Sequence, residues 1–379
     1  MGRSGLWGFA LFQSQWLDWV SECQSSINGL AFDWIAEIVL ISHSMNNLKF
    51  SGFCLLTLVS MMLLGGCGRP ADPNKPIVLR GASQFDENHA FTKTLRKFEE
   101  LVRTYYGKPI DFEVYLNSEL GLEKDYFAYM NQGISVDYGI VSPSHMSTFA
   151  PSAPLIDMPF LFRDLDHWNK VLESDALEPL AEEVHQKADV MLIGYAGGGT
   201  RNLIVNKPVA NMADLKGLDI RVMGAPIQSR IFQAIHASPT VIAYSEVYNA
   251  IQTGVIDAAE NEAAGIRQMK FYEVGPEISL TQHAITVRPI AFSGKTFRRL
   301  PEDLQVAIKK AGREAGAYGR QLESTEDASV LAEMEKAGQL RTHEFNGRDE
   351  LLKLAEPVKQ EYAKSIGAEG VLSRINEVK

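Results

Sequence analysis

A strand-helix-strand pattern repeats through residues 194–262 and constrains the fold of this chain more than any other stretch. Apolar and β-branched runs predict the strands, and helix-capping residues place the helices between them. The predicted elements are strands at 203–205, 218–222 and 255–258, with helices that open at Pro226 and after Ser245. Arg221 lies on the second of these strands, and the third runs into Glu260 and Asn261. The pattern therefore predicts an α/β sheet with polar residues at the ends of short strands.

The segment before this stretch has the same alternation. Strands are predicted at 77–79, 110–116 and 136–141, and helices at 91–102 and 123–132. Such an order is typical of a parallel-type sheet, whose ligands bind at the carboxyl ends of its strands. Four polar residues are therefore candidates to face a cleft: Ser83, Gln84, Ser142 and Ser144.

Two segments are expected to cross between domains. A strand at 189–196 leads into the glycines 197–199, and strands at 279–287 and 290–293 return, with a break at Pro289. Three glycines also suggest a phosphate loop, but no Gly-Lys-Ser/Thr follows them, so a hinge or turn is favoured. These crossings predict two α/β domains with a multi-strand hinge that closes over a ligand.

A long helix is predicted from Pro301, with an inward stripe that continues to Leu322. Gly312, Gly316 and Gly319 each weaken a helix by roughly 1 kcal/mol relative to alanine, so close packing against both domains is expected there. A strand at 339–343 and a helix at 349–366 follow. The predicted division is 77–197 plus 288–325 for domain I and 198–287 plus 326–379 for domain II.

The N-terminal region carries an export signal. From Met45 the chain reads MNNLKFSGFCLLTLVSMMLLGGCGRP, an apolar run too short for an ordinary membrane span that ends in Gly-Gly-Cys. Residues 45–67 resemble a bacterial lipoprotein signal with lipidation at Cys67, and 68–76 form a tether. Residues 1–44 are interpreted as an extension from a wrongly chosen start codon, with a membrane-proximal segment as the alternative.

Composition excludes several classes of protein. The formal net charge of −10 argues against a nucleic-acid footprint. All three cysteines, Cys23, Cys54 and Cys67, precede the folded body, so disulfides, thiolate metal sites and a cysteine nucleophile are excluded there. No metal, cofactor or catalytic residue is predicted.

Four segments carry a resemblance to a known family: GTRNLIVNKPV, DLKGLDIRV, EVYNAIQTGVIDAAEN and APLIDMPFLF. In order and spacing they are similar to the solute-binding proteins of tripartite ATP-independent periplasmic (TRAP) transporters, and the similarity extends from about Ile77 to the C-terminus. Ala258 and Ala259 replace the family's usual Asp-Gly, which we interpret as local turn chemistry. The resemblance implies a class II-like, two-domain periplasmic-binding-protein fold with a long helix across both domains. It also implies a small and a large membrane permease subunit as partners. Together with the lipoprotein signal at Cys67, it implies a location in the periplasm or at the cell exterior, anchored by lipid.

The resemblance also implies the ligand-binding residues. Arg221 matches the family's carboxylate-clamping arginine, Arg201 its second arginine, and Asn261 the asparagine that supports the clamp. Tyr244 matches an aromatic position that packs on the carbon skeleton of the ligand. Gln84 and His89 occupy the turn that contacts its distal end, although a capping or solvated role is equally open for each. From residue type alone, the arginines could instead form ion pairs and Tyr244 could belong to the core.

Two arginines at one end predict a carboxylate, because a guanidinium offers paired donors in the plane of that group. Asn261, Gln84 and the strand-end serines predict hydroxyls beyond it, since unpaired donors disfavour an apolar ligand. A sugar acid such as a uronate or aldonate is the favoured ligand, with C4-dicarboxylates and 2-oxo acids as alternatives. A lyase or isomerase using His89 or His283 is the less favoured class.

Overall fold

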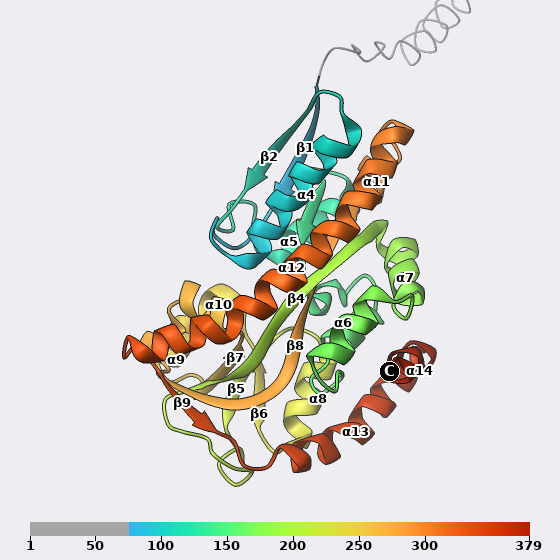
Figure 1. The fold of residues 1–379 in the computed structure, drawn as a ribbon. Helices are drawn as coiled ribbons and strands as arrows, with labels where there is room; N and C mark the ends of the chain where they lie inside the picture. Colours follow the sequence, from blue (N-terminus) through green and yellow to red (C-terminus); the bar gives the residue numbers. More distant parts are fainter. Residues whose placement is uncertain (1–75) are drawn as a thin grey trace, which may run out of the picture. The chain divides into compact units, whose positions relative to one another are not determined.

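One nine-stranded sheet runs through residues 76–379, the part of the chain that this computed structural model describes (Figure 1). The strands lie in the order β2-β1-β3-β8-β4-β7-β5-β6, and β9 pairs with β8. The predicted α/β fold class is confirmed. The predicted extension, the export signal with Cys67 and nearly all of the tether lie outside the described residues.

The first part of the sheet is parallel, as its alternation of strands and helices predicts. Strand β1 (Ile77–Ala82) pairs in parallel with β2 (Ile110–Tyr115) and β3 (Tyr138–Ile140). Helices α4 (Ala90–Tyr106) and α5 (Glu123–Gln132) connect these strands. Gly107 and Gly133 end the helices at φ 64° and 70°, a left-handed conformation that glycine adopts without strain.

Two long strands, β4 (Val190–Val205) and β8 (Glu277–Ser293), run antiparallel and side by side through the middle of the sheet (Figure 1). Their register shifts between Gly197 and Thr200, within the predicted hinge. A Cβ added to Gly197 would lie 2.1 Å from the carbonyl oxygen of Thr286, so only glycine fits there.

The predicted break at Pro289 is wrong, because β8 is continuous through it. Proline lacks only the N–H donor, and its carbonyl oxygen still accepts from the Val141 N–H at 3.2 Å. Arg288, immediately before it, is therefore held in the centre of the sheet, where a break would have exposed it.

Helix α12 (Glu302–Lys336) packs against β4, α4 and α10 (Ala263–Gln268). Figure 1 shows it in orange, crossing the long strand β4. A Cβ added to Gly312 would lie 2.6 Å from the Ile193 carbonyl oxygen, and one added to Gly316 would lie 2.7 Å from the Tyr195 nitrogen. The close packing predicted from these glycines is confirmed, and the helix extends well beyond the predicted stripe.

The second part of the sheet contains β5 (Asp219–Val222), β6 (Ser238–Val241) and β7 (Ala258–Asn261), with β5 parallel to both others. Helices α8 (Pro226–Ala234) and α9 (Val247–Gln252) lie where the sequence predicts them. The strand predicted at 255–258 begins three residues later. Ala258 and Ala259 are therefore buried strand residues and not turn residues as interpreted.

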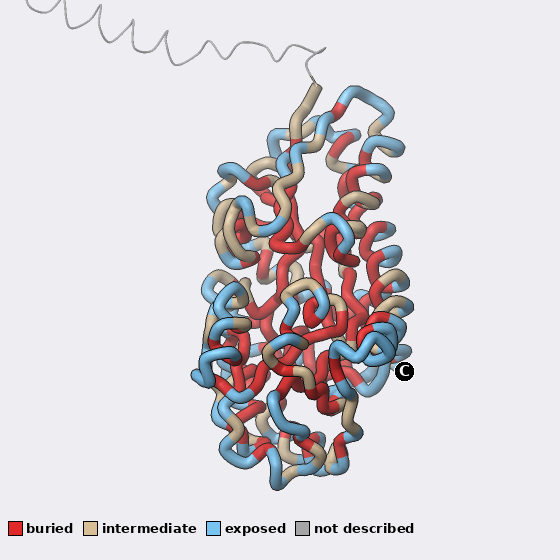
Figure 2. Tube along the Cα trace, turned by 90° about the vertical axis from the view of Figure 1, so that its left-hand side faces the viewer, coloured by how far each residue is buried: buried red, intermediate tan, exposed pale blue. Residues whose placement is uncertain are grey.

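The remaining elements complete the layers. They are the single turns η1 (Pro143–Met146), η2 (Ala153–Asp157), η3 (Tyr244–Glu246) and η4 (Phe271–Glu273), the helices α6 (Leu165–Glu173), α7 (Glu178–Ala188), α11 (Gly294–Phe297), α13 (Arg348–Ser365) and α14 (Glu369–Glu377), and the strand β9 (Arg341–Glu344). Figure 2 shows that buried residues follow the strands and the inner sides of the helices. Within residues 76–379 no helix combines the length and apolar character needed to cross a membrane.

Candidate functional site

A small cavity lies where strand ends from both parts of the sheet meet. Its volume is about 20 Å³. It is lined by five of the six predicted ligand-binding residues, Gln84, Arg201, Arg221, Tyr244 and Asn261. Six further residues line it: Phe85, Glu123, His145, Met223, Glu262 and Arg288. The structure therefore brings together residues that lie more than a hundred positions apart in the sequence.

Arg201, on β4, is held by two glutamates from the end of β7. Its Nε and Nη2 donate to the two carboxylate oxygens of Glu260 at 2.5 and 2.8 Å, and its Nη1 donates to Glu262 Oε2 at 2.7 Å. Burial opposes the charge, but the two carboxylates raise the pKa of Arg201. All three residues are at most 3 % exposed, so this is a buried, satisfied ion-pair network.

Arg221, at the end of β5, is different. Its Nε donates to the Ile242 carbonyl oxygen at 2.9 Å, and within residues 76–379 no carboxylate forms a salt bridge with it. The side chain is buried, and this burial lowers the pKa of Arg221. A buried cation without a counter-ion is costly, so this guanidinium favours an anion in the cavity.

Tyr244 lies beside that guanidinium, and Asn261 hydrogen-bonds to Tyr244. The Asn261 Nδ2 donates to the Tyr244 hydroxyl at 3.0 Å, and the Arg221 guanidinium carbon lies 5.8 Å from the centre of the Tyr244 ring. The ring also packs edge-on against Phe85 at 6.3 Å. Tyr244 therefore presents an aromatic wall to the cavity and fixes the neighbouring arginine.

Gln84 and His89 have separate positions. Gln84 lines the cavity, and its Oε1 accepts from the Glu123 N–H at 3.3 Å. His89 caps α4 by accepting from the Phe91 N–H, and its ring stacks on Phe85 at 4.1 Å. It does not line the cavity, and its ring lies against Phe85, which does.

The serines expected to face a cleft instead form hydrogen bonds with buried residues of the protein. Ser142 and Ser144 each donate a hydroxyl hydrogen to Asp157 Oδ2 at 2.6 Å, and Ser83 bonds to Thr92 at 3.0 Å. None of the three lines the cavity, so this expectation is wrong. Nearby residues of the protein already form hydrogen bonds with these hydroxyls in the absence of a ligand.

Four charged or titratable residues of the cavity are not among the residues that the sequence predicts: Glu123, His145, Glu262 and Arg288. Glu123 was recognised only as the start of a helix, and Arg288 was next to a predicted break. The Arg288 guanidinium lies 4.0 Å from Glu123 Oε1 and 3.8 Å from Asp157 Oδ1. Burial raises the pKa of Glu123, with Arg288 acting against it.

His145 gives the stability of the protein a testable pH dependence. Burial, with Arg221 and Arg288 nearby, lowers its pKa to about 3. The unfolded chain binds a proton at this histidine below about pH 6.5, whereas the folded chain does not, so stability falls as the pH falls from 6.5 to about 3. The free energy of unfolding therefore changes with pH with a definite slope. We expect His145→Gln to reduce this slope by about 1.4 kcal/mol per pH unit. Denaturant unfolding between pH 7 and 4.5 measures it.

The exposed His236 provides the matched control, since His236→Gln keeps the histidine count equal. A slope for His145→Gln that equals the wild-type slope would contradict the neutral state of this partly buried ring.

The described residues hold no group of three or more His, Cys, Asp and Glu side chains placed to bind a metal. His283, the alternative catalytic residue, lies 3.2 Å from Glu260 Oε2 and 2.9 Å from the Thr281 hydroxyl, both within the protein. Its neighbours use both ring nitrogens, which indicates a structural role for this histidine.

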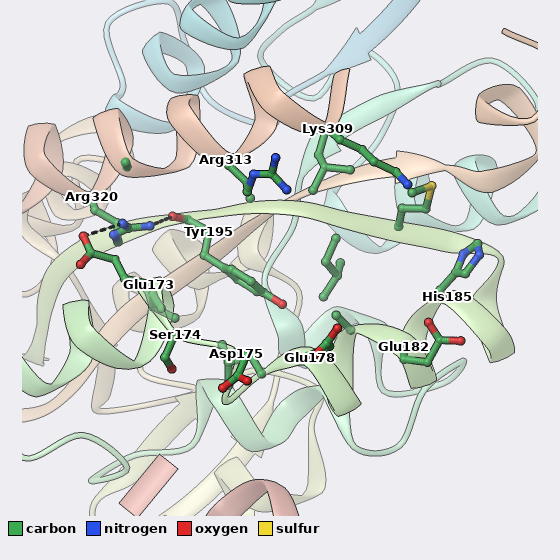
Figure 3. A pocket seen from close by; sticks show the side chains of 18 residues that line it. Glu173, Ser174, Asp175, Glu178, Glu182, His185, Tyr195, Lys309, Arg313 and Arg320 are labelled. Carbon is green, nitrogen blue, oxygen red and sulfur yellow. Dashed lines mark hydrogen bonds and ion pairs between the residues drawn. The ribbon is translucent and has the colours of Figure 1, made fainter. Parts of the chain in front are cut away.

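A larger groove of about 720 Å³ lies elsewhere, between α7 and α12 over β4 (Figure 3). Glu178 and Glu182 line its α7 wall, and Lys309 and Arg313 line its α12 wall. Its buried cation, Arg320, donates to the Tyr195 carbonyl oxygen and to Glu173. Among the residues that the structure describes, this groove has no unpaired buried cation that could bind an organic acid. Its larger volume therefore does not make the groove a better candidate for the ligand site than the small cavity.

Comparisons with known proteins agree on one family. The sequence profile of the bacterial extracellular solute-binding protein family 7 matches residues 82–366. A solute-binding protein of Sulfitobacter sp. strain NAS-14.1 is 60% identical over 298 residues, which cover 79% of this chain and 90% of the relative.

Solved structures give the same result. A TRAP periplasmic solute-binding protein of Sulfitobacter sp. NAS-14.1, with bound α-D-taluronate, has 60% identity and a TM-score of 0.78, covering 79% of this chain and 97% of its own. A TRAP periplasmic solute-binding protein of Citrobacter koseri, with bound D-glucuronate, has 28% identity and a TM-score of 0.74, covering 80% of this chain and 99% of its own.

Proposed function

The chain belongs to the bacterial extracellular solute-binding protein family 7, the solute-binding subunits of TRAP transporters, and we propose that its ligand is a uronate-like sugar acid. The family's members are transport proteins and not enzymes. They act outside the cytoplasmic membrane, where they bind small acids and deliver them to membrane subunits. The class of ligand is the part of the proposal that must be argued from the geometry of the site.

The observation that carries the proposal is the state of Arg221. Of the three arginines that line the cavity, Arg201 pairs with Glu260 and Glu262, and Arg288 lies beside Glu123 and Asp157. Only Arg221 lacks a carboxylate among the described residues. One unpaired guanidinium accommodates one ligand carboxylate through two parallel N–H donors.

The charge balance favours a monocarboxylate over a C4-dicarboxylate. A second ligand carboxylate near Arg288 would meet the carboxylates of Glu123 and Asp157, which already lie within 4.0 Å of that arginine. Hydroxyls meet no such repulsion. The bound taluronate and glucuronate of the two related structures support the same class of ligand.

A thermal-shift screen of the purified protein tests this proposal. We expect D-glucuronate, D-galacturonate or D-taluronate to raise the melting temperature, and succinate and pyruvate to have little effect. A larger shift with succinate would favour the C4-dicarboxylate alternative, and one with pyruvate would favour 2-oxo acids.

Ligand entry requires the site to open, because a cavity of about 20 Å³ holds little more than one water-sized probe. Ligand pockets of this kind enclose several hundred Å³. We propose that residues 77–197 plus 288–325 and residues 198–287 plus 326–379 form two domains that separate at the Gly197–Gly199 segment. X-ray scattering is expected to show a smaller radius of gyration with saturating D-glucuronate than without ligand. An unchanged value at saturation would count against domain closure.

Anchoring by lipid is proposed from the Leu-Gly-Gly-Cys sequence that ends at Cys67. A diacylglyceryl group on this thiol would tether residues 68–379 to a membrane. We expect wild-type protein to incorporate radiolabelled palmitate and to partition with membranes, and Cys67→Ser to lose both properties. Cys54→Ser is the matched control. Equal labelling of wild type and Cys67→Ser would contradict the anchor.

A further inference from the structure

Two unpaired buried atoms face each other across the cavity. Glu123 Oε1 and Arg288 Nε each lack a hydrogen-bond partner within residues 76–379, and they lie 4.0 Å apart. Both residues are at most 4 % exposed. Unpaired buried groups of this kind are rare, because each costs the desolvation of a polar atom.

The rest of each side chain is fixed by the protein. Glu123 Oε2 accepts from the Ser142 N–H at 2.7 Å, and Arg288 Nη1 donates to the Val287 carbonyl oxygen at 3.1 Å. Glu123 opens α5, whereas Arg288 lies on β8, so two separate elements hold the pair in position. The unpaired atoms are therefore preorganised toward each other.

The 4.0 Å separation is too long for a direct hydrogen bond but suits one bridging oxygen. At an oxygen about 2.8 Å from both atoms, the angle between the two contacts would be about 90°, an acceptable hydrogen-bond geometry. With Glu123 ionised beside Arg288, such an atom must accept from Arg288 Nε and donate to Glu123 Oε1. A hydroxyl does both through one oxygen, whereas a carboxylate cannot donate and a methylene can do neither.

We infer that Glu123 and Arg288 form a subsite for one hydroxyl of the ligand and thereby select hydroxylated acids. The inference rests on the proposed function, because it assumes that the carboxylate of the same ligand binds at Arg221. Arg221 then binds the carboxylate, and the Glu123–Arg288 pair binds a hydroxyl further along the carbon chain of the ligand.

The same pair disfavours an acid without that hydroxyl. A deoxy ligand leaves both atoms unpaired or bridged by a water, and both arrangements lose the contact between ligand and protein. A charged group at this position would face Glu123 directly, and Asp157 lies 3.8 Å from the same guanidinium. The subsite therefore discriminates through both geometry and charge.

Calorimetry with D-glucuronate and its 1-, 2-, 3- and 4-deoxy analogues tests the inference in wild type, Glu123→Gln and Arg288→Lys. We expect both variants to bind D-glucuronate about 10–100-fold more weakly than wild type. For one deoxy analogue, wild type should lose affinity to a similar extent, and Glu123→Gln should bind that analogue less than about twofold more weakly than wild type does. An equal loss for D-glucuronate and all four deoxy analogues would overturn the subsite.

The variants are chosen so that folding does not decide the result. Glu123→Gln keeps an oxygen that can accept from the Ser142 N–H, and thermal melting checks that the fold is retained. Glu178→Gln and Arg313→Lys, in the separate groove between α7 and α12, are the matched controls and should bind as wild type does.

The outcomes also separate this inference from the proposed function. Wild type that binds no uronate would overturn both. Wild type that binds D-glucuronate through Arg221, together with a Glu123→Gln variant of unchanged affinity, would overturn the subsite alone.

Discussion

Replacing Arg221 with alanine is expected to weaken the binding of D-glucuronate by about 2–5 kcal/mol, which is at least about 30-fold in Kd. The side chain is 3 % exposed, and within residues 76–379 it has no carboxylate partner. Its removal leaves the ligand carboxylate in a buried site without a counter-charge. Isothermal titration calorimetry measures the change directly.

Arg313→Ala is the control for this experiment. Arg313 is exposed on α12 and lines only the separate groove, so its removal changes the net charge equally without reaching the cavity. Equal affinity of Arg221→Ala and wild type would show that the carboxylate binds elsewhere.

Removal of Arg201 is expected to reduce stability by about 3–5 kcal/mol, because it leaves Glu260 and Glu262 as buried carboxylates without their cation. Burial alone would raise the pKa of Glu260, but Arg201 and then His283 lower it. The effect of Arg201→Ala should therefore be large at pH 7, where Arg201 keeps the buried Glu260 carboxylate charged in the intact protein. Denaturant unfolding in the absence of ligand measures this loss.

Arg298→Ala provides the comparison, since Arg298 also pairs with a carboxylate through two donors, at 2.5 and 2.7 Å from Asp189. Its side chain is 56% exposed, however, and exposed pairs contribute at most about 1 kcal/mol. Similar losses of stability for the two variants would contradict the assignment of Arg201 to a buried network.

The contrast between the two arginines separates their roles at the site. Arg221 forms no salt bridge within residues 76–379, whereas four of the five N–H donors of Arg201 bind Glu260 and Glu262, which lie on either side of Asn261. We propose that Arg201 positions the end of β7 and contributes charge near the carboxylate, while Arg221 makes the principal contact.

Local patterns were sufficient to predict much of the fold. The helix at 123–132 matches α5 residue for residue, because Gly133 supplies a left-handed stop that no longer-range contact overrides. The glycines of α12 predicted close packing, since a helix tolerates them only where a side chain would not fit. Such features depend on neighbours within a few residues.

The pairing of charges could not be predicted from these patterns. Arg201 meets Glu260 because β4 and β7 pair with Asn202 opposite Asn261, and strand pairing over some sixty residues leaves no local signal. Arg288 was missed for a related reason: the Pro289 beside it favours a strand end, and only the strands on either side of β8 keep it in the sheet. For His89, the capping role left open by the sequence is the one that the structure shows, since its side chain accepts from the Phe91 N–H.

The central claim is that the buried guanidinium of Arg221 requires an acid. Calorimetric titration of the wild-type protein with D-glucuronate and with D-glucose, the neutral sugar of the same ring configuration, tests this claim most directly. We expect D-glucuronate to bind at least about 30-fold more tightly, the lower bound for a buried charge pair. Equal affinity for D-glucose would contradict the account.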